Sequence, residues 1–142
     1  MTTMAAKKTQ QRNPYKGSPQ RPWVRLRLQA ADGSTQEVDL LADTGNPCGI
    51  IISRAGMLSL KRADAPDVQS NFGLLEGGWL HVSMPELGLD QPIVSYASDA
   101  VVAASKASSH DFDGLAGLPF LRLLEYGGDP EWFWLRKVKA HP

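Results

Sequence analysis

A strand that ends in a carboxylate constrains this chain more than any other feature of its sequence. The apolar run Leu40–Ala42 leads directly into Asp43, Thr44 and Gly45. An ionised carboxylate at the end of a buried run is costly unless hydrogen-bond donors lie nearby. Gly45 lacks a side chain, so its amide can approach the acid closely, and the Thr44 hydroxyl can tie the loop to another segment. The turn is therefore a platform that holds one acid in a place suited to chemistry.

Two later segments carry further motifs that are read together with this turn. The unbroken β-branched run Ile50–Ile52 predicts a strand covered on both faces. Further on, Leu115-Ala116-Gly117 places two apolar residues and a glycine before a short helix that begins at Pro119. Together with Asp43-Thr44-Gly45, these motifs resemble the retropepsin-like aspartic proteases, the single-domain relatives of retroviral proteases.

The resemblance covers Trp23 to Arg136 and implies a fold, an activity and a set of site residues. The implied fold is all-β, a closed barrel with one short C-terminal helix. The implied activity is that of an aspartic endopeptidase, in which Asp43 is catalytic and neither a metal nor an organic cofactor takes part. The residues that the resemblance assigns to support of the active site are Thr44, Gly45, Asn46, Gly114, Leu115, Ala116 and Gly117.

The mechanism needs two carboxylates that share one proton, one to activate a water and one to donate to the peptide carbonyl. The chain contains Asp-Thr-Gly once, so we expect a two-fold homodimer in which each subunit supplies one Asp43. A second interpretation stays open. Asn46 stands where the family has a small residue, which favours a non-catalytic module that keeps the fold and binds an extended peptide.

Glycines also mark a candidate flap over the site. The segments 68–75 and 79–84 can pair around a turn at 76–78, as in a hairpin that closes over a substrate. The expected flap residues are Leu75, Glu76, Gly77, Gly78 and Trp79.

The remaining elements follow from local patterns. Alternation over Trp23–Leu28 and a turn at Asp32-Gly33 predict a hairpin that returns through residues 37–42. The other expectations are a short helix over 54–60, a loop over 64–67, a strand over 92–97, and a short strand or loop over 101–104. The aromatic run 132–135 lies in a final strand that is buried on both sides or paired with a partner. The segment 110–113 holds His110, Asp111 and Asp113 but lacks the further ligands of a metal site, so we expect a solvated loop there.

Composition limits the classes of partner. With 142 residues, 42% of them apolar, the chain fits one domain, and its 15 basic and 15 acidic side chains give no net charge. Residues 1–22 form a basic arm without an apolar face, so we predict disorder there and a single domain over 23–142. We expect no binding to a membrane and a cytoplasmic location. The hypothesis that Trp79, Trp132 and Trp134 grip single-stranded nucleic acid is disfavoured by the acidic remainder of the chain.

Overall fold

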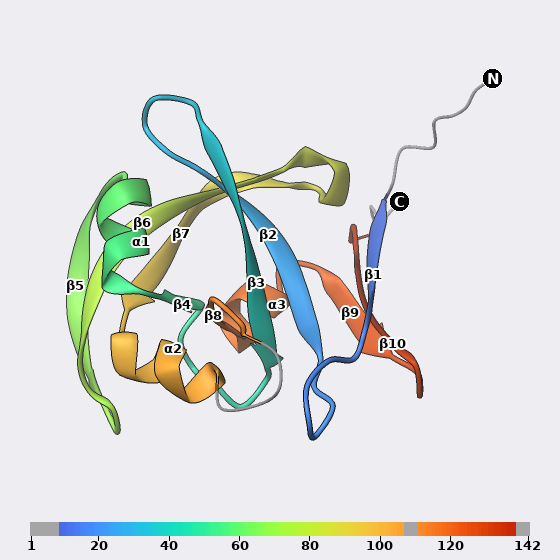
Figure 1. Cartoon of the computed structure of the whole chain (residues 1–142). Helices are drawn as coiled ribbons and strands as arrows, with labels where there is room; N and C mark the ends of the chain where they lie inside the picture. The colour runs from blue at the N-terminus through green and yellow to red at the C-terminus, as the bar shows by residue number, and fades with distance from the viewer. Residues whose placement is uncertain (1–8, 107–110, 139–142) are drawn as a thin grey trace.

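The computed structural model describes residues 9–106 and 111–138, and the chain is mainly β, with 54% strand and 17% helix (Figure 1). The strands are β1 (Gln10–Pro14), β2 (Trp23–Gln29), β3 (Thr35–Asp43), β4 (Ile50–Ile52), β5 (Ala63–Ser70), β6 (Gly73–Met84), β7 (Leu89–Ala97), β8 (Gly114–Gly117), β9 (Glu125–Gly128) and β10 (Trp132–Arg136). The helices are α1 (Arg54–Leu60), α2 (Asp99–Ser105), α3 (Leu118–Leu121) and the 3-10 turn η1 (Pro85–Leu87).

Six strands form a closed barrel, as predicted. Their order is β2-β3-β8-β4-β7-β6, and β2 pairs back with β6 at Leu28–Val82 and Gln29–His81. The pairing of β8 with β3 is parallel, which sets Gly117 opposite Asp43. The Asp43-Thr44-Gly45 motif and the 114–117 motif therefore lie on adjacent strands, and β8 also pairs with β4 on its other side.

The first hairpin follows its sequence pattern. Val24, Leu26 and Leu28 are completely buried on the inner face of β2, while Arg25 points outward. At the turn, Asp32 accepts a hydrogen bond from the Ser34 backbone N–H at 2.9 Å. The hairpin therefore supplies both a wall of the core and the strand that carries Asp43.

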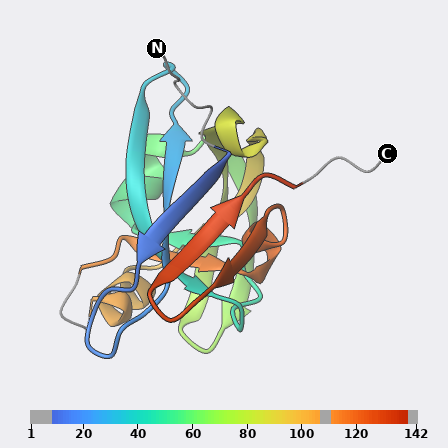
Figure 2. The ribbon, with the colours of Figure 1, turned by 90° about the vertical axis from the view of Figure 1, so that its right-hand side faces the viewer.

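A small sheet in the order β1-β10-β9 packs beside the barrel, where it faces the viewer in Figure 2. Phe133 and Leu135 join the main core, whereas Trp132 and Trp134 are half-buried on the other face. Arg12 lies over the Trp132 ring at 4.7 Å, and Arg136 lies over Trp134 at 4.2 Å. The expectation of burial on both faces was wrong, because β10 has one core face and one face covered by arginines.

Strand β1 corrects the prediction that residues 1–22 are disordered. Its backbone pairs with β10 from Gln10 to Pro14, and the Asn13 side chain donates to the Trp23 carbonyl at 3.0 Å. Lys16 and Arg21 then form a backbone bridge. Local composition gives no sign of this strand, because its stabilising partner lies more than 100 residues away in the sequence. Residues 1–8 of the predicted arm lie outside the described residues.

Local predictions succeeded for α1 and β7 and failed at two other places. The segment predicted as a strand or loop at 101–104 belongs to α2, which Ser98 caps by accepting a hydrogen bond from Val101 N–H at 3.2 Å. The predicted loop at 64–67 lies within β5, which has a register shift between Ala65 and Val68. None of the helices in 9–106 and 111–138 has the length and apolar character that a membrane span requires.

Candidate functional site

Asp43 is the last residue of β3 and its side chain is exposed. The carboxylate Oδ1 accepts a hydrogen bond from Gly45 N–H at 3.0 Å, as the sequence suggested. The Asp43 carbonyl accepts from Asn46 N–H at 3.1 Å, which closes the turn. Thr44, also exposed, occupies the outer corner of this turn. The acid is therefore held by its own loop while most of its oxygen lone pairs stay available.

The loop after Asp43 rests on β8. Gly117 N–H donates to the Gly49 carbonyl at 2.7 Å, and Leu118 N–H donates to the Asn46 carbonyl at 3.0 Å. A Cβ at Gly117 would overlap the Cys48 carbonyl oxygen, so only glycine allows this approach. Gly114 has φ +155° and likewise presses against the Ile51 carbonyl. The glycines of the 114–117 motif thus let two backbone segments touch beneath the acid, and Ala116 between them is completely buried.

Asn46 has one satisfied and one unsatisfied end. Its side-chain Oδ1 accepts from Cys48 N–H at 3.0 Å. Its Nδ2 is buried and has no hydrogen-bond partner among the described residues. A buried donor without an acceptor costs about 1–3 kcal/mol. Asn46 therefore braces the loop with its oxygen and leaves a buried donor without an acceptor among the described residues.

Two hollows meet at Asp43 and form one cleft, the Asp43 cleft. They share four lining residues, which are Asp43, Phe72, Val101 and Leu115. The loop half measures about 580 Å³ and is lined further by Gly45, Asn46, Pro47, Cys48, Ile51, Val68, Gln69, Ser70, Asn71, Leu75 and Tyr96. The helix half measures about 400 Å³ and is lined further by Arg21, Pro22, Leu41, Ala42, Ala104 and Ser105.

The hairpin that borders this cleft turns at a different place from the one predicted. Strands β5 and β6 are joined at Asn71-Phe72, next to Gly73 with φ +92°. Ser70 Oγ fixes the turn by accepting from Phe72 N–H at 3.0 Å and donating to the Gly73 carbonyl at 2.9 Å. The tip lies at the lower end of the molecule in Figure 1, beside α2. Phe72 is 57% exposed there, so the hairpin presents an aromatic side chain to the cleft.

The predicted turn at 76–78 is wrong, because these residues lie inside β6. Of the five predicted flap residues, Leu75 alone lines the cleft. Glu76 forms an ion pair with Arg54 at 2.9 Å, and Trp79 pairs with Ala63 across the hairpin. A Cβ at Gly77 would overlap the Pro66 carbonyl, and one at Gly78 would come within 2.7 Å of Met57 Sδ. These glycines serve close packing, which a sequence cannot distinguish from turn formation.

The structure brings into the cleft several residues that the sequence interpretation missed. They are Phe72 at the hairpin tip, Val101 and Ala104 on α2, and Arg21 before β2. The Asn71-Phe72-Gly73 sequence carried a turn signal that the double glycine obscured.

Two ionisable groups in the loop half are shifted by burial. Burial raises the pKa of the Cys48 thiol. Burial and the nearby Cys48 also raise the pKa of the Tyr96 phenol, so neither group favours its charged form. Within residues 9–106 and 111–138, no three His, Cys, Asp or Glu side chains gather as metal ligands, and His110 lies outside those ranges.

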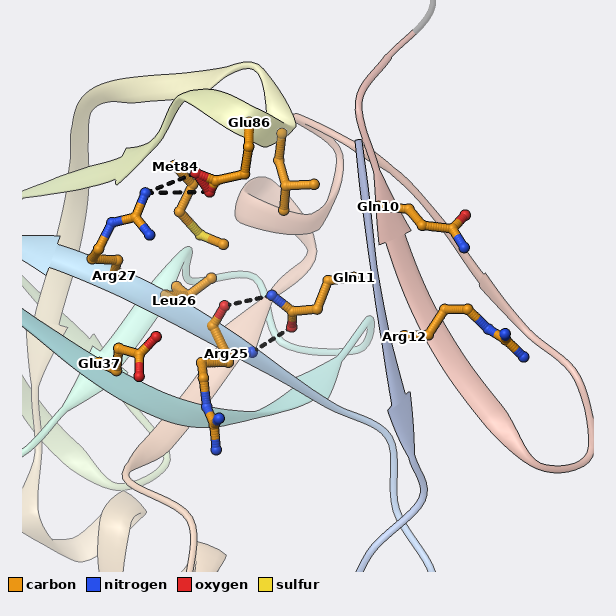
Figure 3. A pocket seen from close by; sticks show the side chains of 10 residues that line it. Gln10, Gln11, Arg12, Arg25, Leu26, Arg27, Glu37, Met84 and Glu86 are labelled. Carbon is orange, nitrogen blue, oxygen red and sulfur yellow. Dashed lines mark hydrogen bonds and ion pairs between the residues drawn. The ribbon is translucent and has the colours of Figure 1, made fainter. Parts of the chain in front are cut away.

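A third hollow, of about 510 Å³, lies between β1 and the barrel and is shown in Figure 3. The Gln11 side chain crosses it from β1 and bonds to both backbone groups of Arg25, at 2.7 and 2.9 Å. Arg27 meets both carboxylate oxygens of Glu86, at 2.7 and 3.2 Å. We call this space the side hollow. The hydrogen bonds of Gln11 and the ion pair of Arg27 join the segments that surround it.

Comparisons of the chain with protein-family models, with curated proteins and with solved structures found no match.

Proposed function

We propose that the chain is an aspartic endopeptidase that works as a two-fold homodimer. One observation carries the proposal: an exposed carboxylate stands where two hollows meet, on a loop fixed by close backbone contact with β8. Apolar side chains such as Leu115 and Val101 line the cleft on both sides of the acid. A cleft of this kind suits an extended peptide, with main-chain polar groups near the acid and side chains on the walls.

The chemistry assigns a role to each group. One Asp43 carboxylate, in its ionised form, removes a proton from a water molecule, which attacks the peptide carbonyl carbon. The second carboxylate, in its protonated form, donates to the carbonyl oxygen. The first carboxylate then passes the proton it took from water to the amide nitrogen, the C–N bond breaks, and the amine leaves while the carbonyl re-forms as a carboxylic acid, returning the second proton to the second carboxylate. Among the described residues that line the cleft, Asp43 is the only acid, so the second carboxylate comes from a second copy of the chain. Gly45 N–H holds one oxygen of each acid in place.

The same observation supports a second candidate function. With one carboxylate per cleft, a monomer binds an extended peptide without cleaving it. The two candidates differ in whether Asp43 must ionise and in whether two chains must meet.

The test is digestion of a peptide library by the purified chain from mildly acidic to neutral pH, with Asp43→Asn beside it. We expect the variant to lose cleavage by about a thousandfold or more. Its stability should change little, because asparagine keeps the oxygen that accepts from Gly45. Undiminished cleavage by Asp43→Asn would refute the proposal.

A mixing experiment tests the dimer. Excess Asp43→Asn chains added to wild type should lower the activity per wild-type chain, because each mixed dimer holds one catalytic acid. Addition of the same excess of wild type serves as the control and should not lower it. Constant specific activity on dilution of a protein that sediments as a monomer would favour another mechanism.

A further inference from the structure

The two halves of the Asp43 cleft differ in charge. Apart from Asp43 itself, the described residues that line the loop half carry no formal charge. The helix half has the same acid and one cation, Arg21, on an otherwise apolar or neutral wall. Within one subunit, the cleft therefore carries a positive charge on one side of Asp43 and none on the other, and the two-fold axis of the proposed dimer repeats this arrangement in the second subunit.

Among the cations of residues 9–106 and 111–138, Arg21 differs from most in forming neither an ion pair nor a contact with an aromatic ring. Within residues 9–106 and 111–138, ion pairs occupy Arg25, Arg27, Arg54, Lys61 and Arg136. Arg12 and Lys16 lie over tryptophan rings. The Arg62 guanidinium donates to the Gln29 carbonyl and to its side-chain oxygen, both at 3.1 Å. The Arg21 guanidinium belongs to none of these groups. Lys106, Arg122 and Lys137 share this condition but do not line the cleft. Arg21 thus combines an unpaired charge with a place in the cleft.

The backbone of Arg21 is fixed although its head group is not paired. Arg21 N–H donates to the Lys16 carbonyl at 2.7 Å, and Lys16 N–H donates back to Arg21 at 3.0 Å. The following residues, Pro22 and Trp23, lead directly into the barrel. The base of the side chain therefore has a set position at the rim, so less freedom is lost when its head group binds.

A guanidinium binds a carboxylate through two parallel hydrogen bonds between opposite charges. The side-chain amide of glutamine has the shape of the glutamate carboxylate but no charge, so its pair with arginine is weaker. Apolar neighbours such as Leu41 and Val101 lower the local dielectric and strengthen the charged pair relative to one in water. We propose that the helix half of the cleft accepts an acidic side chain of the bound peptide, which Arg21 recognises. The inference rests on the proposed function in that the occupant is an extended peptide bound at Asp43.

The test measures binding separately from cleavage. Asp43→Asn serves as the receptor, and the probes are fluorescein-labelled octapeptides of valine, leucine and alanine in which each position in turn is Glu or Gln. We expect Glu to bind about tenfold more tightly than Gln, a difference of about 1.4 kcal/mol, at one peptide position for each Arg21 that the peptide reaches. This means one position on a monomer and two positions on a two-fold dimer. In Asp43→Asn combined with Arg21→Gln, the Glu-to-Gln ratio should fall to about one.

Two controls sharpen the result. Arg122→Gln removes the same charge from an exposed arginine outside the cleft and should leave the ratio unchanged. Arg21→Lys should retain part of the preference, because it keeps the charge but not the fork. A ratio near one at every position, or a preference that survives Arg21→Gln, overturns the inference. An effect of Arg21→Gln on dimer dissociation alone also overturns it.

Cleavage of the same octapeptides by wild type separates this inference from the proposed function. Cleavage without a charge preference overturns the role of Arg21 and leaves the endopeptidase standing. A Glu preference in binding without any cleavage refutes proteolysis and keeps the role of Arg21. Absence of both binding and cleavage overturns both.

Discussion

The Asp43 cleft and the side hollow are opposite in how their polar groups are satisfied. In the side hollow, Glu86 pairs with Arg27 and Gln11 bonds to both backbone groups of Arg25. In the Asp43 cleft, the acid accepts one bond from its own turn and Arg21 has no ion pair among the described residues. In the side hollow, the polar side chains pair with one another or with the backbone and so join two parts of the fold. In the Asp43 cleft, Asp43 and Arg21 stay available to a ligand, because backbone contacts with β8 already hold the loop.

The difference extends to the way each region is held. The walls of the side hollow are joined across the space by side chains, as Figure 3 shows for Gln11 and Arg27. The Asp43 loop is held from beneath by backbone contact with β8 at Gly117. Removal of a side chain should therefore loosen the side hollow, whereas addition of a side chain should damage the Asp43 cleft.

The largest expected effect tests the second half of that statement. Gly117→Ala places a Cβ on the Cys48 carbonyl oxygen and within 2.7 Å of the Asn46 carbonyl, both of them backbone atoms that cannot rotate away. We expect a loss of about 3 kcal/mol in the free energy of unfolding, or failure to fold, because overpacking forces the backbone to shift. Urea unfolding followed by tryptophan fluorescence measures this change.

Gly45→Ala is the matched control in the same loop. Its Cβ would lie 3.4 Å from Asp43 Oδ1, which is an ordinary contact distance. Stability should change by less than about 1 kcal/mol. Equal losses for the two alanine variants would mean that β8 does not brace the loop in the way inferred from its contacts.

A smaller effect tests the side hollow. Gln11→Ala removes two hydrogen bonds to Arg25 and leaves that edge of β2 to water. Because the site is exposed, we expect a loss of only about 1 kcal/mol in the free energy of unfolding. Peptide cleavage per folded chain should stay the same, since Gln11 does not line the Asp43 cleft. Gln10→Ala, whose side chain points away from β2 in Figure 3, is the control. A loss of cleavage in Gln11→Ala without a loss of stability would break the separation between the two regions.

The sequence predicted the parts of this fold that local patterns control. The first hairpin and the buried run Ile50–Ile52 followed from alternation and β-branching. The position of Asp43 beside the 114–117 motif was expected from the resemblance to the retropepsin-like proteases. The flap was misplaced because Gly77 and Gly78 resemble turn residues, whereas their small size serves packing. A glycine can be required either by close packing, which leaves no space for a side chain, or by a positive φ. Only the segments packed against it in the fold distinguish these two causes.

Strand β1 and Arg21 illustrate a second limit. The segment before β2 is polar and rich in proline, so its composition favours disorder. Its order depends on β10, near the other end of the chain, and on the Asn13 and Gln11 amides that bond to β2. Since Arg21 reaches the cleft only when this segment is ordered, its role could not be inferred from local sequence.

The smallest predicted effect concerns charge satisfaction in the small sheet that forms one wall of the side hollow. Asp129 lies in the β9–β10 turn and accepts from Glu131 N–H at 2.9 Å and Trp132 N–H at 2.8 Å. These two bonds lower the pKa of Asp129 in the folded chain.

A carboxyl whose pKa is lower when folded stabilises the fold above its unfolded pKa, about 3.9. It loses that contribution as the pH falls through the folded value. We therefore expect Asp129→Asn to unfold at slightly lower urea than wild type at pH 6, with the gap narrowing as the pH falls below the unfolded pKa of about 3.9. Glu131→Gln removes a charge from the same turn without removing the acceptor of these bonds, so its gap from wild type should not follow this pH dependence. If the difference in urea midpoint between Asp129→Asn and wild type stays constant from pH 6 to pH 2.5, the charge of Asp129 does not stabilise the turn. The charges that stabilise the walls of the side hollow would then be those of its arginine ion pairs.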